Sequence, residues 1–536
     1  MITRPTFAVL VYAVLAVCPI HAAPPTVNYF FPGGGQRGTT VTVTADGTFG
    51  HWPPRVWVDR EGIAVEPAKE SGKLLVTIAA DAVPGACGIR LYDGEGASSA
   101  RPFVVGTLPE VMEREPNDDF KKPQVLDTTS VVVNGRLGKV GDVDTFAMAL
   151  KKGQTLVASL EANRTLRSPL DGHLQVVSPD GFVLEHNDDF HGLDPQIVFP
   201  VPGDGTYLVR TFAFPSVPDS SIRFAGGDKF IYRLTLTTGA FFDYSYPLAV
   251  ARGAPGNVDL VGWNLPTALR TLPVPVPGEA EQVTLFHTQS ASVVRVRLEP
   301  HAAIVKAPAN SRHHPQKIEL PVTITGRIER PGDVNYYQFH GDKGQKLAFR
   351  AEAQTLGFPL DPVLQITDLE GKQLAKAQAG ALGKDPVLDF TVPQDGPFLL
   401  TVRDLHGTGG GRHVYRLQAV LAKPDFGLRL ATDRFVIVPG KPLDVSVTID
   451  RVHGFNSEIE LDVEGVPEGV SVTTLPTDNK KTKTLTLRLS ADRAPYSGAV
   501  RVVGIGKGAD GMTRIAQAAV AELGTATQNL WLTVAK

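Results

Sequence analysis

The chain is poor in cysteine. Its 536 residues include two cysteines, along with four methionines and four tryptophans. Cys18 lies in an apolar N-terminal stretch, so its removal would leave Cys87 alone and exclude an intrachain disulfide. No histidine and asparagine constellation accompanies Cys87, so we expect a small strand residue rather than a nucleophile. Stability must then come from ordinary hydrophobic cores or from bound metal.

Clustered charge of one sign is also missing. The 53 basic and 56 acidic residues leave a net charge of −3. Nucleic-acid binding needs a basic patch or stripe, so we expect no nucleic-acid partner. Beyond the N-terminal stretch no run is long and apolar enough to cross a bilayer, which predicts no transmembrane segment.

Residues 1–23 have the pattern of an export signal. Arg4 provides the positive start, an apolar run extends from Phe7 to Val17, and small residues precede a cleavage position near Ala23. We therefore expect a secreted protein, either periplasmic or released. A cell-surface lipoprotein anchored through Cys18 is the alternative, which we favour less because Val17 is large for the preceding position.

Familiar catalytic motifs are absent as well. The sequence has no HExxH zinc helix, no GxSxG nucleophile elbow, and no glycine loop that follows a strand and opens a helix. A paired-carboxylate site cannot be recognised from sequence alone, because any two carboxylates can meet in space. We expect a protein that is not an enzyme, with a secreted hydrolase as the alternative.

Glycine and proline are abundant, at 53 and 42 residues, and they separate short β-rich runs. Branched and polar residues alternate with a period of two in residues 41–44, 74–78, 207–210 and 485–489. Turn pairs such as Asp46-Gly47 and Asp395-Gly396 punctuate these runs. The pattern predicts an all-β chain of tandem β-sandwiches.

Part of the chain occurs twice. Residues 134–238 and 325–421 share an ordered series of motifs, including GDVDTF at 141–146 against GDVNYY at 332–337. A repeat of this length is a whole domain rather than a solenoid unit. Copying a module is common for binding and spacing, and uncommon as a way to build one catalytic centre.

Breaks in the strand pattern divide the chain into a signal and five modules. The signal is 1–23 and a linker is expected at 301–317. The modules are 25–107, 113–238, 240–300, 318–421 and 427–536.

The duplicated module resembles the bacterial pre-peptidase C-terminal domain family. The resemblance rests on EPND at 115–118, GDVDTF at 141–146, LDGHL at 170–174 and GTY at 205–207. The second copy matches from Gly326 onward, lacks the acidic start, and has Asn335 in place of Asp144. The resemblance implies a jelly-roll-like sandwich found beside secreted peptidases, some members of which bind calcium or polymeric ligands.

Two other modules resemble immunoglobulin-like domains of the IPT/TIG kind. FPGGGQRG at 31–38 carries the resemblance in 25–107, and 240–300 is a degenerate version. The last module is immunoglobulin-like in a generic way.

An acidic segment, residues 113–118, begins the first copy. Pro116 prevents a regular helix there, and in an extended chain Glu113, Glu115 and Asn117 point to one side. Calcium prefers six to eight hard oxygen ligands. The family resemblance implies that this segment and the GDVD turn supply them. The implied ligands are Glu113, Glu115, Asn117, Asp118, Asp142 and Asp144. A solvated acidic linker is the alternative.

Two further sets of residues leave alternatives open. Asn187, Asp188, Asp189 and Asp194 form either a second metal site or a turn capped by its own side chains. A sugar-stacking platform is one interpretation of the aromatic residues, and burial in the cores is the other. These aromatics are Trp52, Trp57, Phe212, Phe214 and Trp263.

The sequence thus predicts a secreted, non-catalytic modular protein that binds or displays at the cell surface or in the extracellular matrix. Its partner would be a polysaccharide or an extracellular protein. Alternatives are a secreted hydrolase or peptidase-associated protein, and a structural spacer without a ligand.

Overall fold

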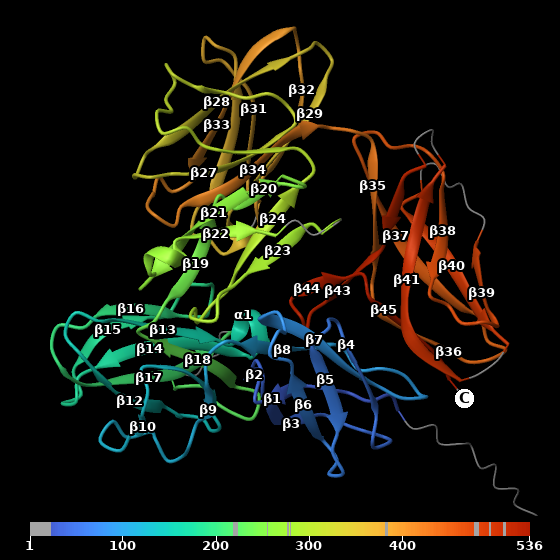
Figure 1. Ribbon diagram of the computed structural model, residues 1–536. Coiled ribbons are helices and arrows are strands. Elements are labelled where there is room, and N and C mark those ends of the chain that lie inside the picture. Colours follow the sequence, from blue (N-terminus) through green and yellow to red (C-terminus); the bar gives the residue numbers. More distant parts are fainter. Residues whose placement is uncertain are drawn as a thin grey trace, which may run out of the picture.

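The computed structural model describes residues 23–535 apart from 218–222, 255, 276–277, 279, 381–383, 476–481, 493–494 and 508–510. The expected signal, with Cys18, lies outside the described residues. Strands in the described part form ten sheets, which pack as successive β-sandwiches along the chain (Figure 1). The all-β tandem-sandwich prediction is therefore confirmed. No helix among the described residues is long and apolar enough to cross a membrane.

The N-terminal sandwich packs a sheet of order β1-β3-β6-β5 against one of order β2-β8-β7-β4. Side chains alternate between the two faces of β3 and β6, so Val43, Leu74 and Val76 point inward and pack in a core with Phe103. Cys87 is a strand residue there, as expected, and burial raises its thiol pKa to about 12. The strands are β1 (Tyr29–Phe31), β2 (Gly34–Gln36), β3 (Thr40–Asp46), β4 (Arg55–Val58), β5 (Ile63–Pro67), β6 (Lys73–Ile78), β7 (Gly85–Tyr92) and β8 (Arg101–Gly106).

The next sandwich, called here the first sandwich of the duplicated pair, has sheets β10-β12-β17-β14-β15 and β16-β13-β18-β11-β9. Its edge strands β9 and β10 pair in parallel with β11 and β12. The elements are β9 (Glu110–Met112), β10 (Gln124–Leu126), β11 (Ser130–Arg136), β12 (Asp144–Leu150), β13 (Thr155–Glu161), α1 (Asn163–Leu166), β14 (Leu170–Val177), β15 (Val183–Asn187), β16 (Gln196–Pro200), β17 (Gly205–Pro215) and β18 (Ile231–Thr237).

A smaller sandwich follows, with sheets β19-β21-β22 and β20-β24-β23. Its core includes Phe242, Val258 and Val296. The elements are β19 (Phe241–Tyr246), β20 (Ala249–Ala251), β21 (Gly256–Trp263), η1 (Thr267–Leu269), β22 (Thr271–Val274), β23 (Gln282–Leu285) and β24 (Val294–Glu299).

The second sandwich of the pair repeats the strand order of the first, with sheets β26-β28-β33-β30-β31 and β25-β27-β34-β29-β32. The elements are β25 (Ala302–Val305), β26 (Gln316–Lys317), β27 (Val322–Arg327), β28 (Val334–Gly341), β29 (Lys346–Glu352), η2 (Gln354–Leu356), β30 (Pro362–Thr367), β31 (Gln373–Gln378), β32 (Val387–Thr391), β33 (Gly396–Asp404) and β34 (Val414–Leu421).

Residues 301–317 are not a free linker in this fold. They contain β25 and β26, which pair in parallel with β27 and β28, so the second sandwich begins at Ala302 rather than at residue 318. The sequence did not indicate these strands, because a short edge strand can form by backbone pairing without an alternating pattern of apolar and polar residues. His313 and His314 lie exposed between these strands.

A glutamine side chain makes the same two backbone hydrogen bonds, called here the glutamine clamp, in each sandwich of the pair. These bonds show which residues of the two N-terminal segments correspond. Gln124 Oε1 accepts a hydrogen bond from Arg114 N at 2.7 Å, and its Nε2 donates to Met112 O at 3.1 Å. Gln316 makes the same two bonds, to Ala307 N and Val305 O, at 2.7 and 3.1 Å. Residues 113–123 therefore correspond in space to residues 306–315.

The C-terminal sandwich has sheets β39-β40-β37-β35-β43-β44 and β36-β45-β41-β38, with β42 beside β41. The strands are β35 (Asp425–Leu430), β36 (Arg434–Ile437), β37 (Leu443–Val452), β38 (Ile459–Glu464), β39 (Val470–Thr474), β40 (Thr484–Ala491), β41 (Tyr496–Gly506), β42 (Thr513–Ile515), β43 (Gln517–Val520), β44 (Thr525–Thr527) and β45 (Leu530–Val534).

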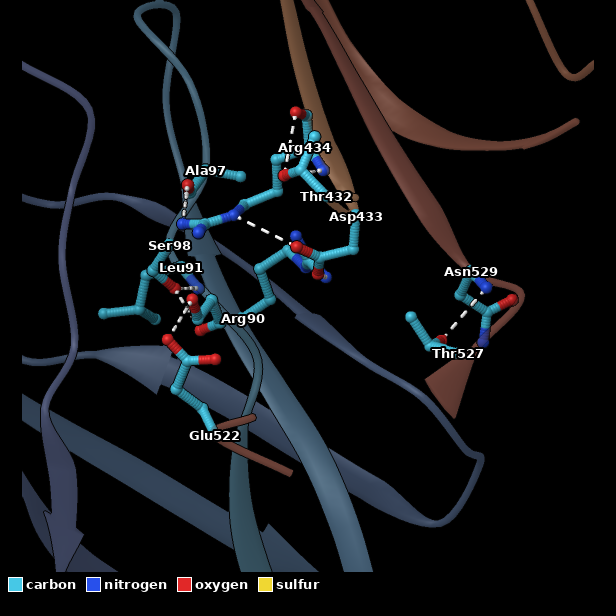
Figure 2. A network of polar contacts seen from close by, with 11 residues as sticks. Arg90, Leu91, Ala97, Ser98, Thr432, Asp433, Arg434, Glu522, Thr527 and Asn529 are labelled. Carbon is cyan, nitrogen blue, oxygen red and sulfur yellow. Dashed lines mark hydrogen bonds and ion pairs between the residues drawn. The ribbon is translucent and has the colours of Figure 1, made fainter. Parts of the chain in front are cut away.

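The C-terminal sandwich docks on the N-terminal one through a buried ion pair. Arg90 of β7 is 1% exposed and bonds to Asp433, and its guanidinium lies near the rings of Trp57 and Trp531, which also contact each other. Figure 2 shows Arg434 reaching the same carboxylate, at 3.2 Å. A buried charge without its partner is costly, so this pair specifies how the two sandwiches meet.

Each sandwich of the pair is also joined to the sandwich before it by an equivalent arginine. Arg233 of β18 is buried and donates two hydrogen bonds to Glu110, at 2.7 and 2.8 Å. A Cβ on Gly34 of the N-terminal sandwich would meet the same guanidinium at 2.0 Å. In β34, Arg416 bonds at 2.8 Å to Glu299 of the smaller sandwich. The duplicated sandwich therefore carries the same arginine contact to its preceding neighbour in both copies.

Replacing either arginine with methionine tests this coupling. We expect Arg233→Met to lower amide protection in both 28–106 and 110–217, because it removes the guanidinium that packs on Gly34 and leaves Glu110 without its counter-charge, with the Asn134 Nδ2 hydrogen bond remaining, at a cost of up to about 3 kcal/mol. Arg416→Met is the matched control and should affect 241–299 and 302–421 instead. Hydrogen exchange with mass spectrometry on the full chain measures both. Loss confined to the sandwich that carries the arginine would contradict the coupling.

Candidate metal centre

Five of the six residues implied as ligands converge at one end of the first sandwich. Their carboxylate oxygens form two groups of three, each within 4.8 Å, and Glu115 belongs to both. One group adds Glu113 and Asp144, and the other adds Asp118 and Asp142. The acidic segment follows β9, while Asp142 lies in the turn before β12 and Asp144 begins that strand.

Backbone pairing holds the acidic segment in place. Glu113 N donates to Asn134 O of β11 at 3.0 Å, and Arg136 N donates to the Glu113 carboxylate at 2.6 Å. The segment therefore continues the path of β9 beside β11, with one end clamped by Gln124. This path brings its side chains toward the start of β12.

The sixth residue, Asn117, is 1% exposed. Its backbone N–H donates to Glu115 Oε2 at 3.0 Å, but its side-chain amide oxygen and nitrogen have no hydrogen-bond partner among the described residues. The buried Oδ1 atoms of Asp142 and Asp144 also lack one. An unpaired buried polar group costs about 1–3 kcal/mol, so the three unpaired oxygens of Asn117, Asp142 and Asp144 call for a partner that accepts their lone pairs. A hard cation fits that donor set.

The electrostatics are those of carboxylates that need a counter-charge. Burial, followed by repulsion from Glu113, raises the pKa of Asp144 to about 9. Burial likewise raises the pKa of Glu113 to about 7 and that of Asp142 to about 6, with neighbouring carboxylates adding to both shifts. A divalent cation would favour the charged forms and reverse these shifts.

Sequence reasoning assigned no role to Tyr232, which lies under the centre. Its hydroxyl donates to Asp144 Oδ2 at 2.6 Å and holds that carboxylate in orientation. A Cβ on Gly135 would lie 2.1 Å from the Tyr232 ring, which explains the glycine there. The same pairing recurs as Gly326 and Tyr415, so the shared Gly and Tyr of the duplicated motifs were the signal available.

Lys139 was also missed. Its ammonium lies 2.9 Å from Asp118, 3.6 Å from Asp142 and 3.9 Å from Glu115. The side chain is 58% exposed, so this lysine partly neutralises the outer group of carboxylates from the solvent side.

The second sandwich replaces the charged centre with neutral hydrogen bonds. Asn335, at the position of Asp144, donates to Tyr415 at 2.8 Å and to Arg327 O at 3.0 Å. Tyr337, in place of Phe146, bonds to Tyr415 at 2.6 Å. The acidic segment is replaced by residues 306–311, where Lys306 stands at the position of Glu113. These polar groups satisfy one another without a metal ion.

The loop that contains Asp188 and Asp189 is held by side-chain hydrogen bonds to the backbone of neighbouring segments. Asp194 accepts hydrogen bonds from the backbone N–H groups of residues 162–164 at the start of α1, and Asn187 Oδ1 accepts one from Gln196 N. Asp188 and Asp189 belong to neither of the three-residue acidic groups found in the described chain. The second metal site is therefore not supported.

The aromatic residues do not form one platform. Trp57 contacts Arg90 at the docking surface, and Trp52 donates to Ala68 O within the N-terminal sandwich. Phe212 is 7% exposed and stacks between His173 and Phe224, so its ring faces are covered, whereas Phe214 is 41% exposed. Trp263 packs near Phe190 and Phe241 in another module.

No family model matches the chain. A probable subtilase-type serine protease of Deinococcus radiodurans is 28% identical over 129 residues, which are 23% of this chain and 18% of that protein. This chain therefore matches less than a fifth of the length of that curated relative.

Two of the solved structures that match parts of this chain are weakly similar to it. One is the pre-peptidase C-terminal domain of a Bacillus anthracis collagenase, with 16% identity and a TM-score of 0.17, covering 20% of this chain and 94% of that one. The other is SGBP-B of the Bacteroides ovatus mixed-linkage glucan utilization locus, in complex with a mixed-linkage heptasaccharide, with 13% identity and a TM-score of 0.16, covering 54% of this chain and 65% of that one.

Proposed function

We propose that this protein is a secreted, non-catalytic modular protein that binds or displays at the cell surface or in the extracellular matrix. In the first sandwich of the pair, a calcium ion would tie the acidic segment to the start of β12. The observation that carries the calcium assignment is the convergence of five carboxylates beside buried Asn117, whose side chain has no partner among the described residues.

The ligands would be Glu113, Glu115, Asn117, Asp118, Asp142 and Asp144. All offer hard oxygens, and calcium tolerates the irregular geometry of a loop joined to a strand end, whereas magnesium demands a near-ideal octahedron. No cysteine or histidine belongs to either acidic group, which disfavours zinc.

A binding or display role is supported by what lines the hollowed surfaces. A groove of about 390 Å³ runs between edge strands β9 and β10 beside the acidic segment. Its lining combines apolar residues, among them Val111, Met112 and Val125, with the polar residues Asp127 and Thr128. The partner class we propose is a polysaccharide or an extracellular protein.

A second candidate is a peptidase-associated role. The match to part of a probable subtilase-type serine protease favours it, since an accessory module and a protease can share such a segment. A spacer without a ligand is the remaining alternative, and binding arrays of glycans and matrix proteins would separate binding from spacing.

Calcium should stabilise the first sandwich and not the second. A ligand that binds only the folded state adds about 2.7 kcal/mol at a hundredfold excess over Kd. In the full chain, calcium should increase amide protection in 110–217 and leave 302–421 unchanged. Asp142→Ala should abolish most of the increase, whereas the equivalent Asp333→Ala should not. Equal responses in both sandwiches, or none in the first, would refute the assignment.

Stability without calcium should fall as pH rises. The folded-state pKa of Asp144, about 9, exceeds its ordinary value of 3.8, so the folded state binds the extra proton. That stabilisation is complete below pH 4 and is lost as pH rises through 9. In chelator the first sandwich should therefore melt lower at pH 9 than at pH 6, and calcium should flatten this slope. Melting curves across pH test it, and parallel slopes with and without calcium would argue against it.

The purified protein should have no hydrolytic activity of its own. None of the motifs that activate a serine or a zinc-bound water occurs in the sequence. Assays on casein and on a panel of polysaccharides provide the measurement. Cleavage above background that a point substitution in this chain removes would favour the hydrolase alternative.

A further inference from the structure

A lysine ammonium lies where the charge of a metal ion is needed. The three carboxylates within 4 Å of Lys139 Nζ are Asp118, Asp142 and Glu115, which are the outer of the two acidic groups. The hydrogen bond to Asp118 raises the pKa of Lys139, so the ammonium stays charged. One exposed positive charge cannot offset five carboxylates, but it reduces their mutual repulsion.

A different lysine takes the inner position in the second sandwich. Lys306 N donates to Thr325 O at 2.9 Å, as Glu113 N donates to Asn134 O at 3.0 Å, so the two residues occupy equivalent places. The Lys306 side chain is only 6% exposed, and its ammonium lies 3.6 Å from Glu329. The second sandwich therefore has a buried lysine where the first has a half-buried glutamate, and this position carries its own positive charge.

We propose that the two sandwiches obtain the same positive charge in two ways. In the first, Lys139 is an exchangeable counter-ion, which a divalent cation displaces into solvent when it binds. In the second, Lys306 is a fixed internal cation that makes the fold independent of metal. The first part rests on the calcium site proposed above; the second does not.

The exposure of each lysine decides its role. Lys139 is more than half solvated, so releasing its ammonium to water costs little, and its competition limits calcium affinity. Lys306 is buried and its side chain cannot be released without opening the segment that follows β25. Because calcium must displace an exposed ion pair, and exposed ion pairs are weak, removing Lys139 should raise calcium affinity by roughly two- to fivefold.

Lys139→Gln in the full chain tests the exchangeable role. Calcium affinity measured by isothermal titration should rise roughly two- to fivefold, while stability in chelator falls because the carboxylates lose their neutraliser. The matched control is Lys152→Gln, which removes one exposed lysine at the turn beyond the opposite end of β12 and should change neither quantity. Unchanged or weaker calcium binding in Lys139→Gln would overturn this role.

Glu113→Lys tests whether an internal ammonium can replace the metal. It should abolish calcium binding, yet in chelator it should melt at or above the neutral control Glu113→Gln. Melting below Glu113→Gln would overturn the fixed-cation role. If the wild-type chain binds no calcium, the calcium proposal and the Lys139 role both fail, while this comparison in chelator still decides the role of Lys306.

Discussion

Mutual repulsion among five carboxylates is the constraint on which the first sandwich of the pair depends. Parallel pairing of β9 with β11 places residues 113–118 against the turn that contains Asp142, so the charges cannot separate without unpairing an edge strand. Burial of Asp142 and Asp144 removes the water that would screen them. The charge of these carboxylates must be offset by protons, by an ammonium group or by a metal ion. The raised carboxyl pKa values show that, without a metal ion, protonation is favoured.

The second sandwich keeps the same backbone arrangement but lacks the cluster of carboxylates that needs a counter-charge. The glutamine clamp, the parallel edge strands and the Gly–Tyr contact all recur there. Asn335 replaces Asp144, Lys306 replaces Glu113, and Tyr337 adds a hydroxyl where the first sandwich has Phe146. Because the backbone is unchanged while the charge balance differs, the two sandwiches are a natural comparison in which metal dependence is separable from fold.

The sequence predicted the sandwiches because half-buried strands alternate, as in residues 41–44 and 485–489, which lie in β3 and β40. It predicted the acidic centre because two carboxylate-rich segments were visible. It could not place β25 and β26, since short edge strands depend on backbone pairing. It also missed Lys139 and Tyr232, because a lysine three residues before an aspartate and a tyrosine about ninety residues later are brought to the site only by the fold.

The inter-domain contacts could not be predicted from the sequence either. Arg90 and Asp433 are 343 residues apart, and nothing in either local pattern indicates a buried ion pair between the first and last sandwiches. Since the arginines of β18 and β34 also anchor neighbouring modules, the chain is a set of docked sandwiches rather than beads on flexible linkers (Figure 1). The candidate metal centre therefore lies in a sandwich that is docked to its neighbours.

The most direct test is an anomalous-scattering map from crystals of the full chain grown with calcium. The account predicts one peak between residues 113–118 and the start of β12, with oxygen ligands at about 2.3–2.6 Å that include the Asn117 side chain. No comparable peak should lie at Asn335. A calcium peak at the second sandwich, or none at the first with Lys139 still bound to the carboxylates, would contradict it.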